Sequence, residues 1–314
     1  MRQTRRAVVQ LLVMVVAVGG LFVDPAGAVT LNIEIDYMVL RDQNNNILHS
    51  HMPSQAEVNA VIQMFACHGI TLNAVIDDEI PHVNVIPDNP GNDKTIFGFS
   101  LEPNSQYLMK LAYFDNAGGP WHYCIFGHQY QLEGATTGSS GLAERPGDDL
   151  VVTLGSFSNQ IGTPFDRAST LAHEFGHNLG LRHSGAMDED LVGPGNIVMP
   201  SVMTYNFQLD GVRTNLLCLG LTQEAANLFK EIDYSEGRAC GLVEAGLSEA
   251  FGNGMRQIDW NCDGSISGSS SRSLTNVYKN DTWCGAGAGA NTLTDYNEWA
   301  NLVDVTLLAD KRLI

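Results

Sequence analysis

Alternating apolar and polar residues mark the first regular segment of the chain. The stretch VTLNIEIDYMVL (29–40) has a period of two and is rich in β-forming residues, which predicts a strand. Further strands are predicted where similar runs lie between Gly, Pro and Asn clusters, at 70–76, 121–128, 140–144 and 149–155.

Helical spacing replaces this alternation in 53–69. The segment opens with Pro53 and Ser54, carries apolar residues three or four positions apart, such as Val58 and Val61, and closes at Gly69. This pattern predicts a helix with one face packed on the sheet.

A second helix is predicted from Thr163 to about Leu179. Thr163 is a suitable N-cap, Pro164 suits the first helical position, and Asp166 stands where a capping box places its acid. Gly180 then ends the helix.

Strand signals fade beyond residue 184, where Gly-rich loops alternate with the helical patterns 222–232 and 295–308. The chain is expected to adopt an α/β (α+β) fold with a twisted mixed sheet. We expect an N-terminal subdomain over 29–183 and a smaller, irregular subdomain over 184–314.

Residues 1–28 have the layout of a secretory signal peptide. Basic residues precede the run AVVQLLVMVVAVGGLFV, and small residues at Ala26 and Ala28 form a cleavage site. An uncleaved anchor is the alternative, because the run is near the short limit for spanning a bilayer. Cleavage after Ala28 predicts a secreted protein without stable membrane association.

The composition is strongly acidic, with a net charge of −18. Residues 1–28 hold three arginines and one aspartate, so their removal would make the charge −20. Such a surface repels nucleic acid and anionic lipid. A nucleic-acid partner is therefore not expected, and the oligomeric state stays open.

Six cysteines remain in the predicted mature chain and allow up to three disulfides. None stands in a C-x-x-C pair, which argues against zinc binding by cysteine. Sequence proximity favours pairing Cys218 with Cys240 and Cys262 with Cys284, which leaves Cys67 for Cys124.

The segment HEFGHNLGLRH (173–183) has the highest concentration of candidate catalytic and metal-binding residues, with three histidines and one glutamate. His173 and His177 are four residues apart on the predicted helix, so both imidazoles project from one face and can share a zinc ion. A turn at Gly180 can bring His183 to the same ion as a third ligand. Three protein ligands leave a position for water, as in catalytic zinc sites.

Glu174 lies about 100° around the helix from His173, given about 3.6 residues per turn. It is therefore placed to act on water at the zinc ion rather than to bind the ion. Its predicted role is that of general base, taking a proton from water and passing it to the leaving amine.

The spacing HExxHxxGxxH resembles the metzincin clan of zinc peptidases. SVMTY (201–205) is similar to the Met-turn of that clan, of astacin or serralysin type, although Ser184 is typical of matrixins. The resemblance implies that Met203 forms an apolar floor beneath the zinc site, with Met199 as the rival. It also implies that Tyr205 assists the transition state.

The same resemblance implies a substrate-binding edge strand. SGLAE followed by DLVVTLG is similar to the edge strand and inner strand that precede the active-site helix in these enzymes. An extended substrate would then pair with this edge by β-addition. The residues concerned are Ser140, Gly141, Leu142 and Ala143.

A candidate calcium loop occurs in DWNCDGS (259–265). Acidic and amide side chains occupy alternate positions, but the twelfth position is Ser270 rather than glutamate. A solvated turn is an equal alternative, and Asp295 or Glu298 would have to complete a calcium site. The candidate ligands are Asp259, Asn261, Asp263 and Ser265.

Other histidines are scattered through the strands and loops. We interpret His49, His51, His122 and His128 as hydrogen-bonded or exposed side chains rather than metal ligands.

The sequence thus predicts a secreted zinc endopeptidase that acts on protein or peptide substrates. Two alternatives remain, namely a zinc amidase acting on non-protein amides and a non-catalytic secreted adhesion or metal-binding module.

Overall fold

The computed structural model describes residues 29–91, 95–186, 199–212, 231–238, 242–243, 292–293 and 295–306. Among them, no helix is long and apolar enough to cross a membrane. The predicted signal peptide (1–28) lies outside these ranges, so signal cleavage and secretion stay predictions.

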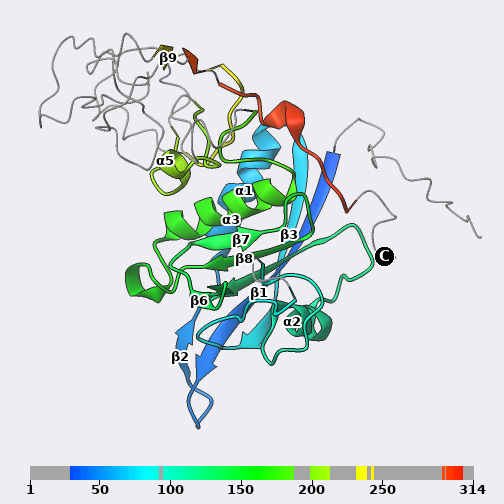
Figure 1. Cartoon of the computed structure of the whole chain (residues 1–314), viewed down its shortest axis with the longest axis vertical. Helices are drawn as coiled ribbons and strands as arrows, with labels where there is room; N and C mark the ends of the chain where they lie inside the picture. Colours follow the sequence, from blue (N-terminus) through cyan, green and yellow to red (C-terminus); the bar gives the residue numbers. More distant parts are fainter. Residues whose placement is uncertain are drawn as a thin grey trace, which may run out of the picture.

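A six-stranded mixed sheet forms the centre of the fold (Figure 1). The strand order is β2-β1-β4-β8-β7, and β3 also pairs with β1. The pairs β1·β3, β1·β4 and β4·β8 are parallel, whereas β2 and β7 run antiparallel to their neighbours. The strand bounds are β1 (Val29–Arg41), β2 (Ile47–Ser50), β3 (Ile70–Pro81), β4 (His122–Gly127), β7 (Gly141–Ala143) and β8 (Asp149–Thr153).

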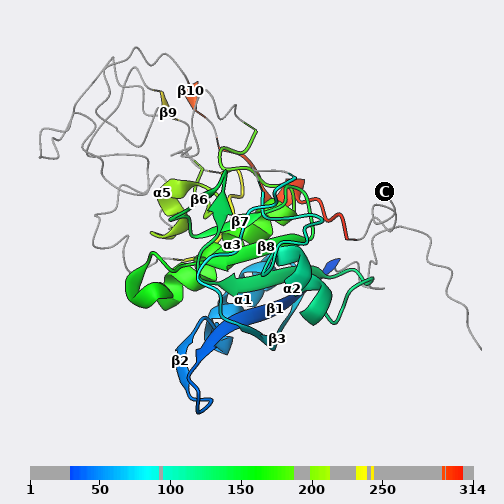
Figure 2. The same ribbon diagram turned by 60° about the horizontal axis from the view of Figure 1, so that its bottom comes forward.

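Two long helices, α1 (Gln55–Cys67) and α3 (Pro164–Asn178), cover one face of the sheet, and α2 (Gln106–Tyr113) lies on the other face (Figures 1 and 2). Capping boxes begin both long helices, from Ser54 with Glu57 and from Thr163 with Asp166. The helices and strands predicted between residues 29 and 179 are confirmed to within a few residues. Sequence reasoning missed α2 and the short strand β2.

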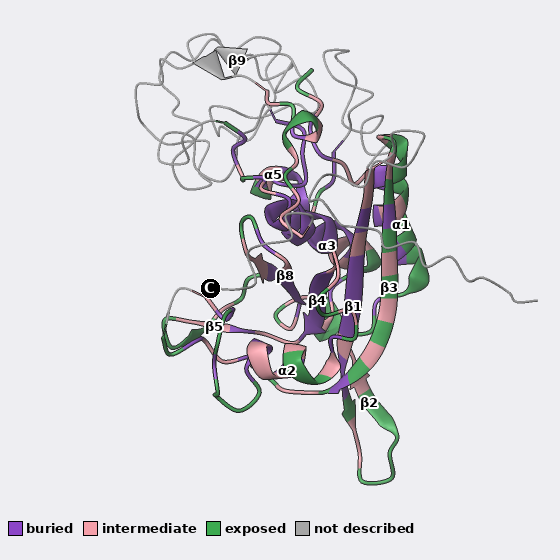
Figure 3. Ribbon diagram, turned by 90° about the vertical axis from the view of Figure 1, so that its right-hand side faces the viewer, coloured by how far each residue is buried: buried purple, intermediate pink, exposed green. Residues whose placement is uncertain are grey.

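Both faces of the inner strands are buried, as Figure 3 shows for β1, β4 and β8. Successive residues of β4 alternate between two cores: Cys124 and Phe126 pack with α1 and α3, whereas Tyr123 and Ile125 pack with Met109 of α2. The chain is therefore a mixed α/β fold with few helices, consistent with the metzincin-like α+β architecture expected from the sequence.

Several short elements lie outside the central sheet and the three helices. The pair β5 (Gln131–Leu132) and β6 (Ala135–Thr136) and the pair β9 (Leu242–Val243) and β10 (Thr292–Leu293) form separate two-stranded sheets. Two turns of 3-10 helix follow β8 and β10, η1 (Ser158–Gln160) and η4 (Trp299–Asn301).

The helix predicted over 295–308 is wrong for the residues described, because 295–306 contain only the turn η4. Polar side chains of this segment instead form hydrogen bonds with Ser235. Glu298 is buried and accepts a hydrogen bond from the Ser235 N–H (2.8 Å), and Asp295 accepts one from Ser235 Oγ (2.5 Å). These tertiary contacts override a local helical preference. The helical pattern 222–232 lies almost entirely outside the described residues.

The predicted Cys67–Cys124 disulfide is wrong, since both thiols are free. Cys124 is buried on β4 within the core, whereas Cys67 is exposed at the end of α1 and accepts a hydrogen bond from Gln63. The pairing of Cys67 with Cys124 was predicted only because these two cysteines remained after the others were paired, and it rested on no information about their distance. The other four cysteines lie outside the described residues, and the division at residue 183 stays a prediction.

Candidate active site

Helix α3 brings the candidate ligands together. It begins at its capping box, and Gly180 follows with a φ of 88°, a left-handed conformation that glycine adopts without strain. The Gly180 N–H donates to His177 O (2.9 Å) and the Leu181 N–H to Gly176 O (2.9 Å), which is a Schellman end. The chain therefore leaves the helix sharply, and His183 returns beside its last turn.

The Nε2 atoms of three histidines converge. His177 Nε2 lies 3.2 Å from His173 Nε2 and 2.9 Å from His183 Nε2. The three ring centroids are 4.6–5.2 Å apart, and one nitrogen from each ring belongs to a group able to hold a metal ion.

Backbone carbonyls orient two of these rings from behind. His173 Nδ1 lies 2.7 Å from Val202 O, and His177 Nδ1 lies 2.9 Å from Leu181 O. Each Nδ1 must carry the proton to donate to a carbonyl, so each Nε2 keeps its lone pair for a cation.

Electrostatics keeps the three rings neutral. Burial, followed by the neighbouring His177 and His183, holds the pKa of His173 well below its usual value. Burial also lowers the pKa of His177 to about 4 and that of His183 to about 3. Neutral imidazoles are the form that binds metal.

Glu174 is 3% exposed, and burial raises the pKa of its carboxyl well above the usual value. It reaches from α3 to the edge strand β7, where a Cβ added to Gly141 would lie 2.6 Å from Glu174 Oε1 and 2.7 Å from its Cγ. Gly141 is therefore the residue that makes room for this carboxylate.

Met203 lies under the helix, fully buried. A Cβ at Gly176 would collide with its sulfur, so Met203 packs directly against the backbone of α3 between His173 and His177. The turn around it is held by Ser201, whose Oγ accepts from the Met203 N–H (2.9 Å). Met199, the rival candidate, is also buried in the same core.

Tyr205 begins the short helix α5 (Tyr205–Gln208) and is 51% exposed. Its ring centroid lies 4.6 Å from that of His183 and 6.0 Å from that of His173. The structure thus places this tyrosine beside the three histidines on the solvent side.

The candidate substrate strand occupies the edge of the sheet. Among the described residues, β7 pairs only with β8, and Leu142 and Ala143 are half-buried. Gly141 O accepts hydrogen bonds from Tyr130 Oη (3.0 Å) and Ser139 Oγ (3.2 Å). Ser140 is held by Gln208 Nε2 (2.9 Å), which connects the edge strand to α5.

Other candidates from the sequence are the calcium loop and His122. Asp259, Asn261, Asp263 and Ser265 lie outside the described residues, so the calcium loop stays a prediction. Both acids considered as its distant ligands already bind Ser235. His122 is buried and hydrogen-bonded, with Nδ1 3.1 Å from Asn178 Oδ1 and Nε2 3.2 Å from Asp304 Oδ1, which confirms its interpretation as a hydrogen-bonded residue.

Sequence reasoning missed two residues that support α3. Tyr234 is fully buried and donates from Oη to Ala172 O (2.6 Å), the carbonyl just before His173. Asn178 donates from Nδ2 to Glu144 O and Asp149 O, both at 2.9 Å, and so ties the end of the helix to β8. Tyr234 carries no sequence signal, whereas Asn178 lies within the histidine motif (173–183).

No family model matches the chain, and no curated protein matches it. Among solved structures, the crystal structure of archaemetzincin from Methanopyrus kandleri is similar at 13% sequence identity, over 52% of this chain and 79% of that chain. The TM-score is 0.26. A likeness this slight adds nothing to the fold or the site.

Proposed function

We propose that this chain is a secreted zinc-dependent endopeptidase of metzincin type, with His173, His177 and His183 as zinc ligands. The observation that carries the proposal is the convergence of three Nε2 atoms, in which those of His173 and His183 lie within 3.2 Å of His177 Nε2. The rings of His173 and His177 are fixed through Nδ1. Secretion is supported by the signal-peptide pattern of residues 1–28.

The donor set fits zinc. Two nitrogens bound at about 2.0–2.1 Å in tetrahedral geometry lie roughly 3.3 Å apart, close to the spacings found here. Neutral imidazoles held by carbonyls are typical zinc ligands, and a set of three leaves a coordination position open. When bound in such a site, zinc supplies a water of lowered pKa and a polarised substrate carbonyl.

Glu174 moves the proton in the proposed reaction. Its carboxylate accepts a proton from the attacking water and then delivers it to the nitrogen of the leaving amine. Burial raises the pKa of Glu174 and makes it a stronger base than a surface glutamate. Tyr205 Oη would donate a hydrogen bond to the oxygen that gains charge as the carbonyl carbon becomes tetrahedral.

An extended peptide suits the edge strand. β7 is antiparallel to β8 at the end of the sheet and adjoins Glu174 through Gly141. A peptide paired with this edge would lie beside the general base, which favours an endopeptidase over an amidase for compact non-protein substrates.

The test is cleavage of casein and of a peptide library by purified protein, with metal content measured on the same samples. Wild type should cleave both, and a zinc chelator should abolish cleavage. Glu174→Gln should keep its zinc and lose at least about 10²-fold in kcat, as removal of a general base does. Glu102→Gln, an exposed acid outside the site, is the control.

Three results would contradict the proposal. Wild type that holds zinc yet leaves all amide substrates intact would indicate a non-catalytic metal-binding module. Cleavage of small non-protein amides alone would indicate the amidase. Full activity in Glu174→Gln would remove the proposed base.

A further inference from the structure

Four histidines gather at a second place in the protein, outside the candidate active site. His49 lies on β2 and His51 follows that strand, while His82 and His128 follow β3 and β4. One ring nitrogen from each lies within 4.8 Å of the others. All six pairs of ring centroids are 4.6–5.9 Å apart.

The register of the sheet explains why residues so distant in sequence meet. Val39 on β1 pairs with Ser50 on one side and with Pro81 on the other, so His51 and His82 both leave the sheet beside it. Backbone hydrogen bonds extend these pairings, since the His51 N–H donates to Met38 O (2.9 Å) and the His82 N–H to Val39 O (3.2 Å). The carbonyl of His128 accepts from the Gly155 N–H (2.8 Å). The four rings therefore stand on a fixed backbone.

Hydrogen bonding alone does not satisfy this cluster. His51 Nε2 lies 3.1 Å from His49 Nε2 and 3.3 Å from His128 Nδ1. An imidazole nitrogen carries either one proton or one lone pair in the ring plane, so it completes one of these contacts and not both. His82 Nε2 is buried and has no hydrogen-bond partner among the described residues.

A cation resolves both difficulties, because it accepts a lone pair from every ring at once. The spacings of 3.1 and 3.3 Å match the roughly 3.3 Å edge of a tetrahedral zinc site and the 2.9 and 3.2 Å of the first cluster. We propose that His49, His51, His82 and His128 form a second metal site, which binds a divalent transition-metal ion.

The chemistry of the donors defines the class of ion. All four are imidazoles, which suit Zn²⁺, Cu²⁺ and Ni²⁺, whereas Ca²⁺ and Mg²⁺ require oxygen ligands. Burial, followed by the neighbouring histidines, lowers the pKa of His51 to about 3, and burial also lowers the pKa values of His82 and His128. A lowered pKa favours the neutral imidazole, which is the form that binds a metal ion.

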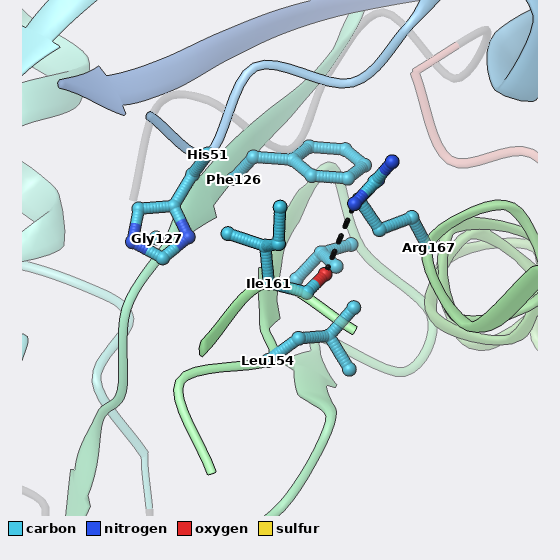
Figure 4. Close-up of a pocket in the computed structure, with 7 residues that line it drawn as sticks. His51, Phe126, Gly127, Leu154, Ile161 and Arg167 are labelled. Carbon is cyan, nitrogen blue, oxygen red and sulfur yellow. Dashed lines mark hydrogen bonds between the residues drawn. The ribbon is translucent and has the colours of Figure 1, made fainter. Parts of the chain in front are cut away.

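Access and surroundings also suit an ion. A surface cavity of about 460 Å³ is lined by His49, His82 and His128, which gives a path from solvent. On the inner side His51 lies beside Gly127 in a small pocket, with Arg167 at its opposite end (Figure 4). Arg167 donates to Ile161 O (3.4 Å) and to Glu57 Oε2 (2.8 Å), so its charge is neutralised locally.

Four protein ligands make a closed site, which is the structural rather than the catalytic arrangement. The ion would fasten the β1–β2 hairpin to the ends of β3 and β4. It would also be separate from the first site. The two groups share no residue, and His173, the ligand of the first site nearest to Arg167, lies six residues beyond it on α3, about 9 Å at about 1.5 Å per residue.

Multi-element mass spectrometry of untagged protein, dialysed against metal-free buffer after loading with Zn²⁺, counts the ions. Wild type should hold two per chain. A variant carrying His49→Gln and His82→Gln should hold one, and so should a variant carrying His173→Gln and His177→Gln. Combining all four substitutions should leave none. His68→Gln, a histidine outside both clusters, should keep two.

Zn²⁺-dependent stability provides a second measurement. Adding Zn²⁺ to the variant that lacks His173 and His177 should raise its melting temperature, because an ion that binds only the folded state stabilises it. The same addition should not raise the melting temperature of the four-substitution variant. Circular dichroism checks that each variant folds, and His82→Gln alone replaces the double variant if that one does not.

The proposal is overturned if the variant lacking His49 and His82 holds as much metal as wild type. It is also overturned if the second ion is lost on dialysis and returns only at millimolar Zn²⁺. Failure of the proposed peptidase gives a different pattern, in which removing His173 and His177 leaves metal content unchanged or no amide is cleaved.

Discussion

Gly141→Ala tests the contact between the edge strand and the proposed general base. A Cβ at this position would lie 2.6 Å from Glu174 Oε1 and 2.6 Å from Val151 O. Val151 O belongs to the backbone of β8, which is fixed by its pairing with β4 and β7. The contact with Val151 O is relieved only if β7 itself shifts, whereas the contact with Glu174 is relieved if the carboxylate withdraws.

The size of the effect follows from these distances. Ordinary Cβ contacts begin at 3.4 Å, so Glu174 Oε1 must withdraw by the difference between 3.4 and 2.6 Å, about 0.8 Å. A displacement of about 1 Å at a catalytic group costs about 10²-fold in rate. Overpacking of the strand adds a stability loss of about 1–3 kcal/mol. We therefore expect kcat/KM to fall about 10²-fold while zinc at the three histidines is retained.

Steady-state kinetics on a cleaved peptide, together with urea unfolding and metal content, measures these effects. Gly138→Ala is the matched control, because a Cβ there meets nothing nearer than Ser156 Oγ at 3.7 Å. A double-mutant cycle with Glu174→Asp should be non-additive, since the two residues touch. Near-wild-type kinetics in Gly141→Ala, or strict additivity in the cycle, would refute the reasoning.

Three further predictions concern other residues. Tyr205→Phe should lower kcat by about 10²-fold with little change in KM, as loss of an oxyanion donor does, and an unchanged kcat would remove that role. Asn178→Ala removes the side-chain donor to Glu144 O and the partner of the buried His122 Nδ1, while Asp149 O keeps the Glu144 N–H, and it should cost about 1–3 kcal/mol of unfolding free energy in urea. Burial raises the pKa of Glu298 to about 8 from 4.5, so the stability linked to its protonation is complete below pH 4.5 and is lost as pH rises toward 8. Glu298→Gln should thus stabilise the protein at pH 7 by about 3 kcal/mol and have little effect at pH 4, whereas Glu102→Gln should show no such pH dependence.

Much of the fold between residues 29 and 179 could be predicted because its signals are local. The capping box of Thr163 and Asp166 and the turn at Gly180 depend only on neighbours in the chain, and the structure contains them as expected. The segment 295–306 differs because its conformation depends on Ser235, about 60 residues away. The spacing of apolar residues within a segment gives no information about hydrogen-bond partners that are distant in the sequence.

The same distinction applies to the edge strand. Its place at the edge of the sheet is what the resemblance to the metzincin clan implied, but the need for glycine at 141 was not predicted. That need arises where Glu174 of α3 meets the backbone of β7, two elements joined only in the folded chain. The support of α3 by Tyr234 has the same origin and left no mark in the local sequence.

The two histidine clusters show why one candidate metal site can be predicted from the sequence and the other cannot. Seven of the nine histidines belong to them. In the first cluster, helix geometry sets the spacing of the ligands. All three therefore fall within eleven residues of sequence, and the motif can be recognised there directly. In the second, the sheet supplies the spacing, through the pairing of Val39 with both Ser50 and Pro81. Only His49 and His51 carry a local trace of it, since residues two apart on a strand face the same side. The separations of 3.1 and 3.3 Å around His51 Nε2 are close to the 2.9 and 3.2 Å around His177 Nε2, so a shared metal ion suits both clusters, and counting ions in the two double variants tests each separately.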